Sequence, residues 1–154
     1  MSDHVVIGRQ AGYSNPEVVS RIHHQRRDQV DLLVRAGREQ TEVWFGIEGQ
    51  PKRWMRVGYA GSYGAALFVD ETTPAGVDWA WAALSPEPQT EPPTIYYDPD
   101  GVTIFPPTTV MPLNRLRDVI LEWVNTAERP TSVDWMPVNG LVWELTNDGS
   151  INVP

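Results

Sequence analysis

Two fragments of the chain carry residues that could act as a nucleophile or as an acid–base pair. Residues 60–64 read AGSYG, which sets Ser62 between two glycines as in the nucleophile turn of some hydrolases. That turn must lie between a strand and a helix, whereas the next residues, AALFVD, read as a strand. The adjacent acids Asp70 and Glu71 would point to opposite faces of a strand and could not easily flank one substrate. We therefore interpret Ser62 as part of a turn between two strands and expect no catalytic residue.

The histidines and the remaining acids lack the spacing of a metal or cofactor site. His23 and His24 are adjacent, so their rings would diverge on the helix expected there, and His4 is the only other histidine. Residues 98–101, DPDG, share two acids and a glycine with calcium loops, but they lack a third oxygen ligand and a late glutamate. No glycine-rich phosphate loop is present. We expect no metal and no cofactor.

Composition favours a single soluble domain that spans residues 1–154. A chain of 154 residues has a common domain size and can bury a substantial core. It contains no run of 18 apolar residues, so we expect no membrane span, and its first ten residues do not resemble a signal peptide. The absence of cysteine excludes disulfides and thiolate chemistry and suits a reducing cytoplasm.

Charge is distributed unevenly along the chain, whose formal net charge is −8. Residues 1–60 hold nine Lys and Arg against seven Asp and Glu, whereas residues 61–154 hold three against thirteen. Between residues 57 and 114 there is no Lys or Arg, although seven acids lie there. A surface of this kind repels nucleic acid and attracts basic partners. The alternative is a solvated face that only keeps the protein soluble.

The same acidic stretch carries aromatic residues, and this combination predicts a surface for a protein partner. Aromatic side chains supply much of the energy of an interface, while charges set the association rate and the specificity. Trp79 and Trp81 lie two residues apart on an expected strand, where they would share a face that is either core or partner-binding. The candidate partner-binding residues are Asp70, Glu71, Asp78, Trp79, Trp81, Glu87, Glu91, Tyr96, Asp98 and Asp100.

The N-terminal part of the chain predicts a strand followed by a helix. Residues 5–8 form a short apolar run typical of a strand. Asn15 can cap a helix that has Pro16 in its first position, and the apolar spacing then favours a helix over residues 16–27 or longer. Residues 30–34 fit either a continuation of that helix or a separate strand.

The middle and the end of the chain predict several short strands. Residues 85–94 contain four prolines and are expected to form an extended loop within the domain. Trp44 and Trp54 are expected in the core, while Trp143 has no clear position. The predicted strands are 41–47 and 53–60, joined near residues 49–51; 65–69; 76–84; a hairpin of 94–97 and 102–105; 133–135; and 141–145.

A second helix is predicted over residues 112–126. One apolar stripe at helical spacing is formed by Leu113, Leu116, Val119, Ile120, Trp123 and Val124. Pro112 suits the first helical position, and Pro130 lies beyond the end. Trp123 and Trp135 are expected in the core. Because strands outnumber helices, we predict an α+β fold, a mostly antiparallel sheet with two main helices, 16–27 or longer and 112–126.

The segment from this helix to Trp135 closely resembles the C-terminal signature of immunity protein family 1 of bacterial polymorphic toxin systems. We refer to it as the ERP signature, and its matching positions are Pro112, the helix to Val124, Glu128, Arg129, Pro130, Val133, Asp134 and Trp135. Many relatives have Thr-Gly before ERP, whereas this chain has Thr126-Ala127, which concerns a helix cap and not any chemistry. Residues 59–64 are also similar, less specifically. The resemblance implies a cytoplasmic antidote that binds a toxin domain, often one that deaminates nucleic acid.

The sequence leaves three functions from different classes to be compared. The first is a non-catalytic immunity protein that binds a basic, nucleic-acid-acting toxin one to one, without itself contacting nucleic acid or membrane. The second is a Trp-rich module for a small ligand or carbohydrate, which requires a row of coplanar exposed tryptophans. The third and weakest is a hydrolase that uses Ser62, because no histidine has a suitable setting to act as its base.

Overall fold

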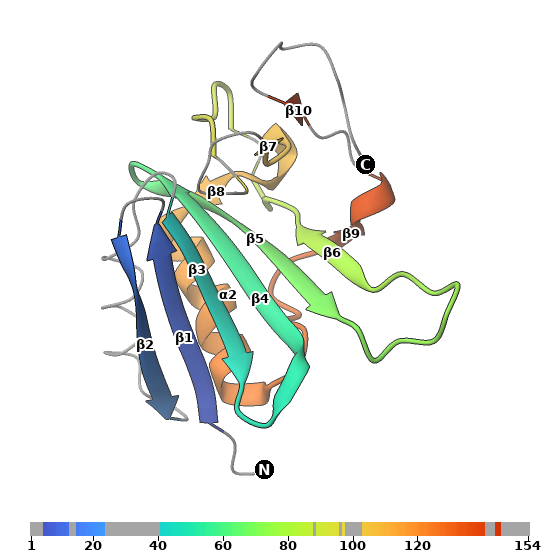
Figure 1. Ribbon diagram of the computed structural model, residues 1–154. Helices are drawn as coiled ribbons and strands as arrows, with labels where there is room; N and C mark the ends of the chain where they lie inside the picture. The colour runs from blue at the N-terminus through green and yellow to red at the C-terminus, as the bar shows by residue number, and fades with distance from the viewer. Residues whose placement is uncertain are drawn as a thin grey trace.

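The fold is an antiparallel sheet with one long helix packed across one face, as the computed structural model shows (Figure 1). The structure describes residues 5–12, 15–23, 41–87, 89–95, 97, 103–140 and 144–145. The strands are β1 (Val5–Gly12), β2 (Asn15–His23), β3 (Thr41–Ile47), β4 (Gln50–Ala60), β5 (Tyr63–Asp70), β6 (Ala80–Ala83), β7 (Thr103–Ile104), β8 (Met111–Pro112), β9 (Trp135–Pro137) and β10 (Glu144–Leu145). The helices are η1 (Pro107–Thr109), α2 (Leu113–Thr126) and η2 (Val138–Gly140), of which η1 and η2 are single 3₁₀ turns.

The main sheet has eight strands, all paired in antiparallel fashion. Its order is β2-β1-β3-β4-β5-β6-β9, and β8 pairs with β5 outside this path. A separate two-stranded sheet joins β7 to β10. The predicted α+β class and antiparallel sheet are confirmed, and the predicted strands at 41–47, 53–60 and 65–69 correspond to β3, β4 and β5.

The predicted N-terminal helix is wrong, because its first residues form strand β2. The register pairs Val6 with Ile22 and Arg9 with Val19, so β2 is held by the neighbouring strand β1. Asn15 and Pro16 do resemble a helix start, but long-range pairing overrides such a local preference, and Val and Ile suit a strand equally well. The rest of that prediction, and residues 30–34, lie outside the described residues.

The second predicted helix is confirmed as α2, and its apolar stripe faces the sheet. Leu116, Val119, Ile120, Trp123 and Val124 are all buried in a cluster with side chains of β3, β4 and β5. Pro112 precedes the first helical residue and does not begin the helix. The helix ends at Thr126, and the next residue, Ala127, caps it in a left-handed conformation with φ 55°.

The opposite face of the sheet has its own, smaller core. Leu67, Val69 and Ala82 point away from α2 and pack with Ile95, Phe105 and Val110 from the segment before the helix. Strand β5 is therefore buried on both faces, which explains why its sequence is a continuous apolar run and lacks alternation.

Gly64 permits the close contact between β5 and α2. A Cβ atom at this position would overlap the Leu116 side chain and would lie 3.0 Å from the carbonyl oxygen of Gly58. The glycine of the AGSYG segment is thus required by helix packing.

Several other predicted strands also differ from the structure. Residues 76–84 were expected to form one strand, but β6 begins only at Ala80, and residues 71–79 form a loop with a turn at Gly76 (φ 84°). In the predicted 94–105 hairpin, the Phe105 N–H donates to the Ile95 carbonyl at 2.8 Å, but β7 pairs with β10 instead. Residues 98–102, its expected turn, lie outside the described residues.

Candidate functional site

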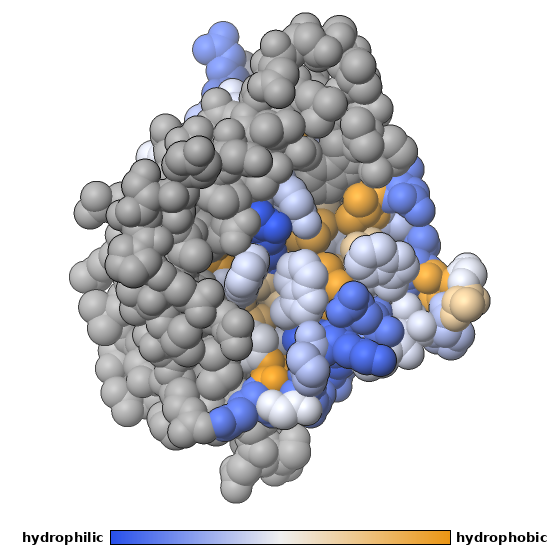
Figure 2. Space-filling view, viewed as in Figure 1, coloured by the Kyte–Doolittle hydropathy of each residue, from blue (hydrophilic) through white to orange (hydrophobic). Residues whose placement is uncertain are grey.

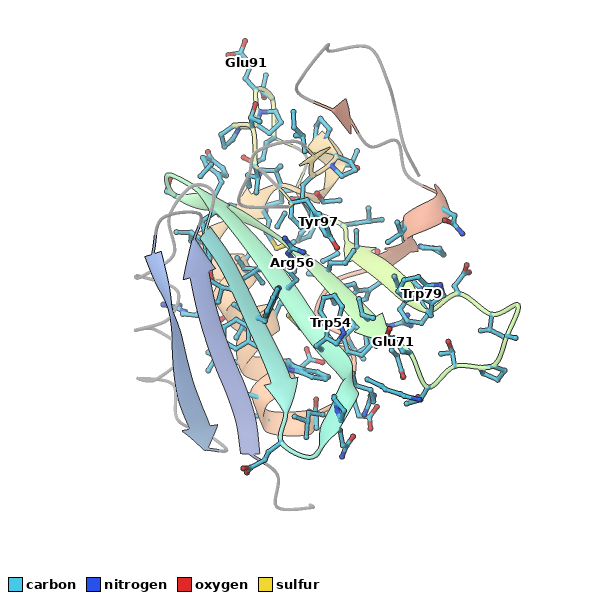
Figure 3. All side chains as sticks on the ribbon, viewed as in Figure 1. Trp54, Arg56, Glu71, Trp79, Glu91 and Tyr97 are labelled. Carbon is cyan, nitrogen blue, oxygen red and sulfur yellow. The ribbon has the colours of Figure 1, made fainter. Side chains whose placement is uncertain are left out.

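The predicted partner-binding residues fall into separate regions of the surface, and one of these is the loop between β5 and β6. We call residues 71–79 the β5–β6 loop. Glu71, Asp78 and Trp79 are all exposed there, and Trp79 and Glu71 lie at the base of the loop (Figure 3). Val77 and Trp79, at 51% and 54% exposure, are the exposed large hydrophobic residues of the described chain. The loop thus combines apolar and acidic groups.

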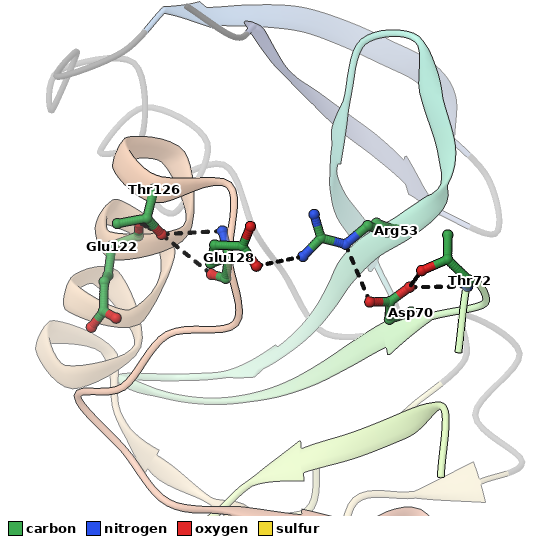
Figure 4. Close-up of polar contacts among 6 residues, drawn as sticks. All are labelled: Arg53, Asp70, Thr72, Glu122, Thr126 and Glu128. Carbon is green, nitrogen blue, oxygen red and sulfur yellow. Dashed lines mark hydrogen bonds and ion pairs between the residues drawn. The ribbon is translucent and has the colours of Figure 1, made fainter. Parts of the chain in front are cut away.

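Asp70, immediately before this loop, has partners within the chain. Its Oδ1 accepts hydrogen bonds from Thr72 Oγ1 and from Thr72 N at 3.0 Å, and its Oδ2 lies 3.3 Å from Arg53 Nε (Figure 4). Burial alone would raise the pKa of Asp70, but the Thr72 hydrogen bonds and the Arg53 charge outweigh it and hold the pKa below its usual value. Asp70 therefore has a structural role at the base of the loop.

Trp81 lies on the helix side of the sheet, in contrast to the prediction that it shares a strand face with Trp79. Its ring packs against Phe68, with centroids 6.1 Å apart, and the Arg129 guanidinium lies over it at 4.7 Å. Trp79 precedes β6 and extends into solvent. The two tryptophans consequently do not form one surface.

The remaining predicted acids lie away from the loop. Glu87 and Glu91 are exposed on the proline-rich segment, which the structure describes except for Pro88 and which has no helix or strand. Glu91 lies at the top of the view in Figure 3, well separated from Glu71. Glu87 borders a polar hollow at the start of α2 together with Arg115 and Asp118. Tyr96, Asp98 and Asp100 lie outside the described residues.

The ERP signature forms contacts that join the end of α2 to the sheet. Glu128 Oε2 accepts a hydrogen bond from Arg53 Nη2 at 3.0 Å, and Arg129 stacks on Trp81 (Figure 4 shows the first of these contacts). The Pro130 carbonyl accepts a hydrogen bond from Trp135 Nε1 at 2.7 Å. These contacts give the signature a structural role.

Val133 and Trp135 complete this attachment, but the predicted strand 133–135 is confirmed only at Trp135, where β9 begins. Val133 is buried, and Trp135 is half-buried with its ring edge-on to Phe68 at 6.1 Å. The fully buried Trp123 contacts the same Phe68 ring at 5.2 Å, so Phe68 is the common partner of several tryptophans.

Glu122 has a structural function that the sequence did not reveal. Glu122 lies off the buried stripe of α2, yet its carboxylate accepts hydrogen bonds from Thr131 N and from Ser132 N, the latter at 3.0 Å. Burial would raise its pKa, yet these hydrogen bonds hold the pKa of Glu122 below its usual value. Because the partners lie nine and ten positions away, beyond a bend, helical spacing could not have identified them.

A second cluster that the sequence did not single out lies on the sheet face opposite α2. The Arg56 guanidinium lies 4.1 Å from the Tyr97 ring and 5.9 Å from the Trp44 ring, and Arg56 is only 8% exposed. Trp44 and Trp54 are half-buried, so the prediction that they belong to the core is confirmed only in part. The alternation of side chains along a strand puts residues 54 and 56 on one face, and this was the sequence signal that could have revealed the cluster.

The fragments that imitate catalytic sites have structural explanations. Ser62 lies in the turn between β4 and β5, and its carbonyl accepts the Leu113 N–H at 2.9 Å. The interpretation as a turn between strands is confirmed. His23 ends strand β2, so the expectation of a helical position is wrong, and His24 lies outside the described residues. Within the described parts, no group of three His, Cys, Asp or Glu could hold a metal ion.

Comparison with known protein families identifies the chain. Residues 16–137 match the family model of Immunity protein Imm1, and the chain belongs to this family of immunity proteins. The match confirms the resemblance carried by the ERP signature, and it implies a cognate toxin protein as partner. No curated protein and no solved structure matches the chain. None of the helices described is long and apolar enough to cross a membrane.

Proposed function

We propose that this protein is a stoichiometric inhibitor that binds one cognate toxin domain in the cytoplasm and occludes its active site. It acts by binding and not by catalysis. The toxin belongs to a polymorphic toxin system and acts on nucleic acid, with a DNA cytidine deaminase as the first candidate and a nuclease as the second. Direct binding of nucleic acid by the inhibitor is disfavoured by its charge.

The observation that carries the proposal is that this immunity protein exposes acidic side chains in more than one region of its surface. Glu71, Asp78, Glu87 and Glu91 are all exposed, and no Lys or Arg lies between residues 57 and 114 to neutralise them along the chain. An enzyme that acts on nucleic acid needs a basic cleft for phosphate. Carboxylates can fill such a cleft, accelerate encounter with it and exclude the substrate.

The alternative of a carbohydrate-binding module finds less support. It would need a row of exposed, coplanar tryptophans, whereas Trp79 is the only exposed tryptophan among the described residues. A single exposed ring next to carboxylates is better suited to a protein partner.

The direct test uses the C-terminal domain of the protein encoded by the adjacent reading frame. The purified domain is assayed on single-stranded DNA for uracil formation and for strand cleavage, with increasing amounts of the full chain. We expect a one-to-one complex by light scattering and loss of toxin activity at one equivalent. Activity that persists at excess inhibitor, or the absence of a complex, would contradict the proposal, while the reaction product distinguishes deaminase from nuclease.

A further inference from the structure

The β5–β6 loop projects from the body of the protein and combines the chemical groups of a binding anchor. It extends beyond the sheet in Figure 1 and forms the lobe at the right of the surface in Figure 2. Val77 and Trp79 expose about half of their surface, and the acids Glu71 and Asp78 flank them. The loop contains no Lys or Arg. Large apolar side chains at such a position are candidates for burial against a partner.

The base of the loop is closed by backbone hydrogen bonds. The Asp70 N–H donates to the Trp79 carbonyl at 2.8 Å, and the Glu71 N–H donates to the Lys52 carbonyl at 2.8 Å. The first bond joins the residue before the loop to the last residue of the loop. It therefore fixes the position from which the Trp79 side chain extends. The second attaches the loop to β4.

The tip of the loop and its support are also defined. The Val77 N–H donates to the Pro74 carbonyl at 3.2 Å, which closes a turn near the tip. Below the loop, Arg53 lies between Asp70 and Glu128 and thereby connects the loop base to the segment after α2 (Figure 4). A loop with this support loses little conformational freedom when it binds, so more of its contact energy contributes to affinity.

We propose that the β5–β6 loop anchors the complex with the toxin. Trp79 and Val77 enter an apolar slot on the toxin domain, and Glu71 and Asp78 pair with Lys or Arg on the rim of that slot. This inference rests on the proposed function and narrows the interface from a dispersed acidic stretch to one preorganised loop.

A toxin with a basic rim suits this loop better than the other possible occupants. In a symmetric contact between two copies of this chain, Glu71 and Asp78 of both copies would approach each other and repel. A glycan would use the ring of Trp79 but would gain nothing from the two carboxylate charges. Charge complementarity therefore favours a basic protein surface.

The experiment measures binding of the full chain to the same adjacent-frame domain by surface plasmon resonance. We expect Trp79→Ala to weaken affinity about 30-fold or more, as for a central interface residue. Val77→Ser should weaken it less, by roughly 5- to 10-fold. The double variant Glu71→Gln/Asp78→Gln should slow association about tenfold at low salt.

The matched control is Asp118→Asn/Asp134→Asn, which removes two exposed acids that lie outside the loop and outside the proposed binding surface. It should leave affinity within about twofold of the wild type, since only contacts at the anchor carry large effects. All variants should keep the wild-type unfolding temperature because the changed side chains are exposed. Hydrogen exchange gives an independent measure, because the amides of residues 71–79 should exchange more slowly in the complex.

The outcomes separate this inference from the proposed function. If the wild type binds the domain but the Trp79→Ala variant binds equally well, or if the Asp118/Asp134 control is the variant that loses affinity, the loop is not the anchor. Loss of self-association or of glycan binding on Trp79→Ala, with toxin binding intact, would also overturn it. If the wild type fails to bind the toxin, the proposed function itself fails.

Discussion

The ion pairs of Arg53 allow a quantitative test of how the β5–β6 loop is supported. Arg53 contacts Asp70 at 3.3 Å and Glu128 at 3.0 Å, but the side chains of Asp70 and Glu128 are 19% and 73% exposed. Exposed ion pairs contribute about 0–1 kcal/mol, whereas a pair whose two side chains are both largely shielded from solvent is screened less and can couple by about 0.5–3 kcal/mol. The shorter contact should therefore be the weaker one.

A double-mutant cycle measures each contribution separately. Arg53→Met is combined with Asp70→Asn in one cycle and with Glu128→Gln in the other, and urea unfolding at pH 7 gives the free energy of each protein. We expect a coupling of about 1.5 kcal/mol for the shielded ion pair with Asp70 and about 0.3 kcal/mol for the exposed contact with Glu128. Arg53→Met alone should lower the free energy of unfolding by about 2 kcal/mol, which corresponds to roughly 4–8 °C in unfolding temperature for a chain of this size. Equal couplings, or a larger one for Glu128, would refute the reasoning.

The pH dependence gives the same cycle a second readout. The pKa of Asp70 is lowered in the folded state, so its contribution is complete above the ordinary aspartate pKa of about 3.9 and is lost as the pH falls through the folded-state value. The Arg53–Asp70 coupling should therefore persist at pH 5 and decline only below about pH 4. A coupling that disappears well above pH 5 would mean that the carboxylate is not stabilised in this way.

Three further predictions concern packing, the helix end and kinetics. Gly64→Ala should lower the free energy of unfolding by about 1–3 kcal/mol, because the new Cβ would overlap Leu116 and crowd the Gly58 carbonyl. Gly46→Ala is the control: its Cβ would meet only a carbonyl oxygen at 4.0 Å, so the loss in the same urea titration should be much smaller. Ala127→Gly should raise stability by about 0.5–1 kcal/mol because the residue has a left-handed backbone (φ 55°), and an unchanged or lower unfolding midpoint would contradict this. Association with the toxin should slow steeply as salt rises while dissociation changes little, and stopped-flow association rates that stay flat would remove the electrostatic part of the proposal.

The sequence predicted those elements whose signal is local. The stripe of α2 was visible because its buried residues recur at helical spacing, and the strands β3 to β5 were visible as β-branched and aromatic runs. Strand β2 was not predicted, because Asn15 and Pro16 resemble a helix start and only the pairing with β1 makes the segment extended. A local sequence pattern does not reveal which distant segments pair as strands.

The candidate site was predicted as residues that are neighbours in the sequence, whereas a binding surface consists of residues that are exposed side by side in the fold. Asp70 counts as an acid in the sequence, yet Arg53 of β4 neutralises it in the fold. Trp79 and Trp81 are two positions apart, but one is exposed in a loop and the other packs under Arg129. The basic partner inferred from composition stays a prediction, while the environment of each individual acid and tryptophan became visible only with the strand pairings.

The contacts of the ERP signature have a consequence for how such proteins diversify. The ERP signature holds the end of α2 against the sheet through Glu128, Arg129 and Pro130. The β5–β6 loop lies outside that signature and adds little to the two hydrophobic cores. On the present proposal, mutations in the loop can therefore retarget the inhibitor to a new toxin while the framework that carries it stays the same.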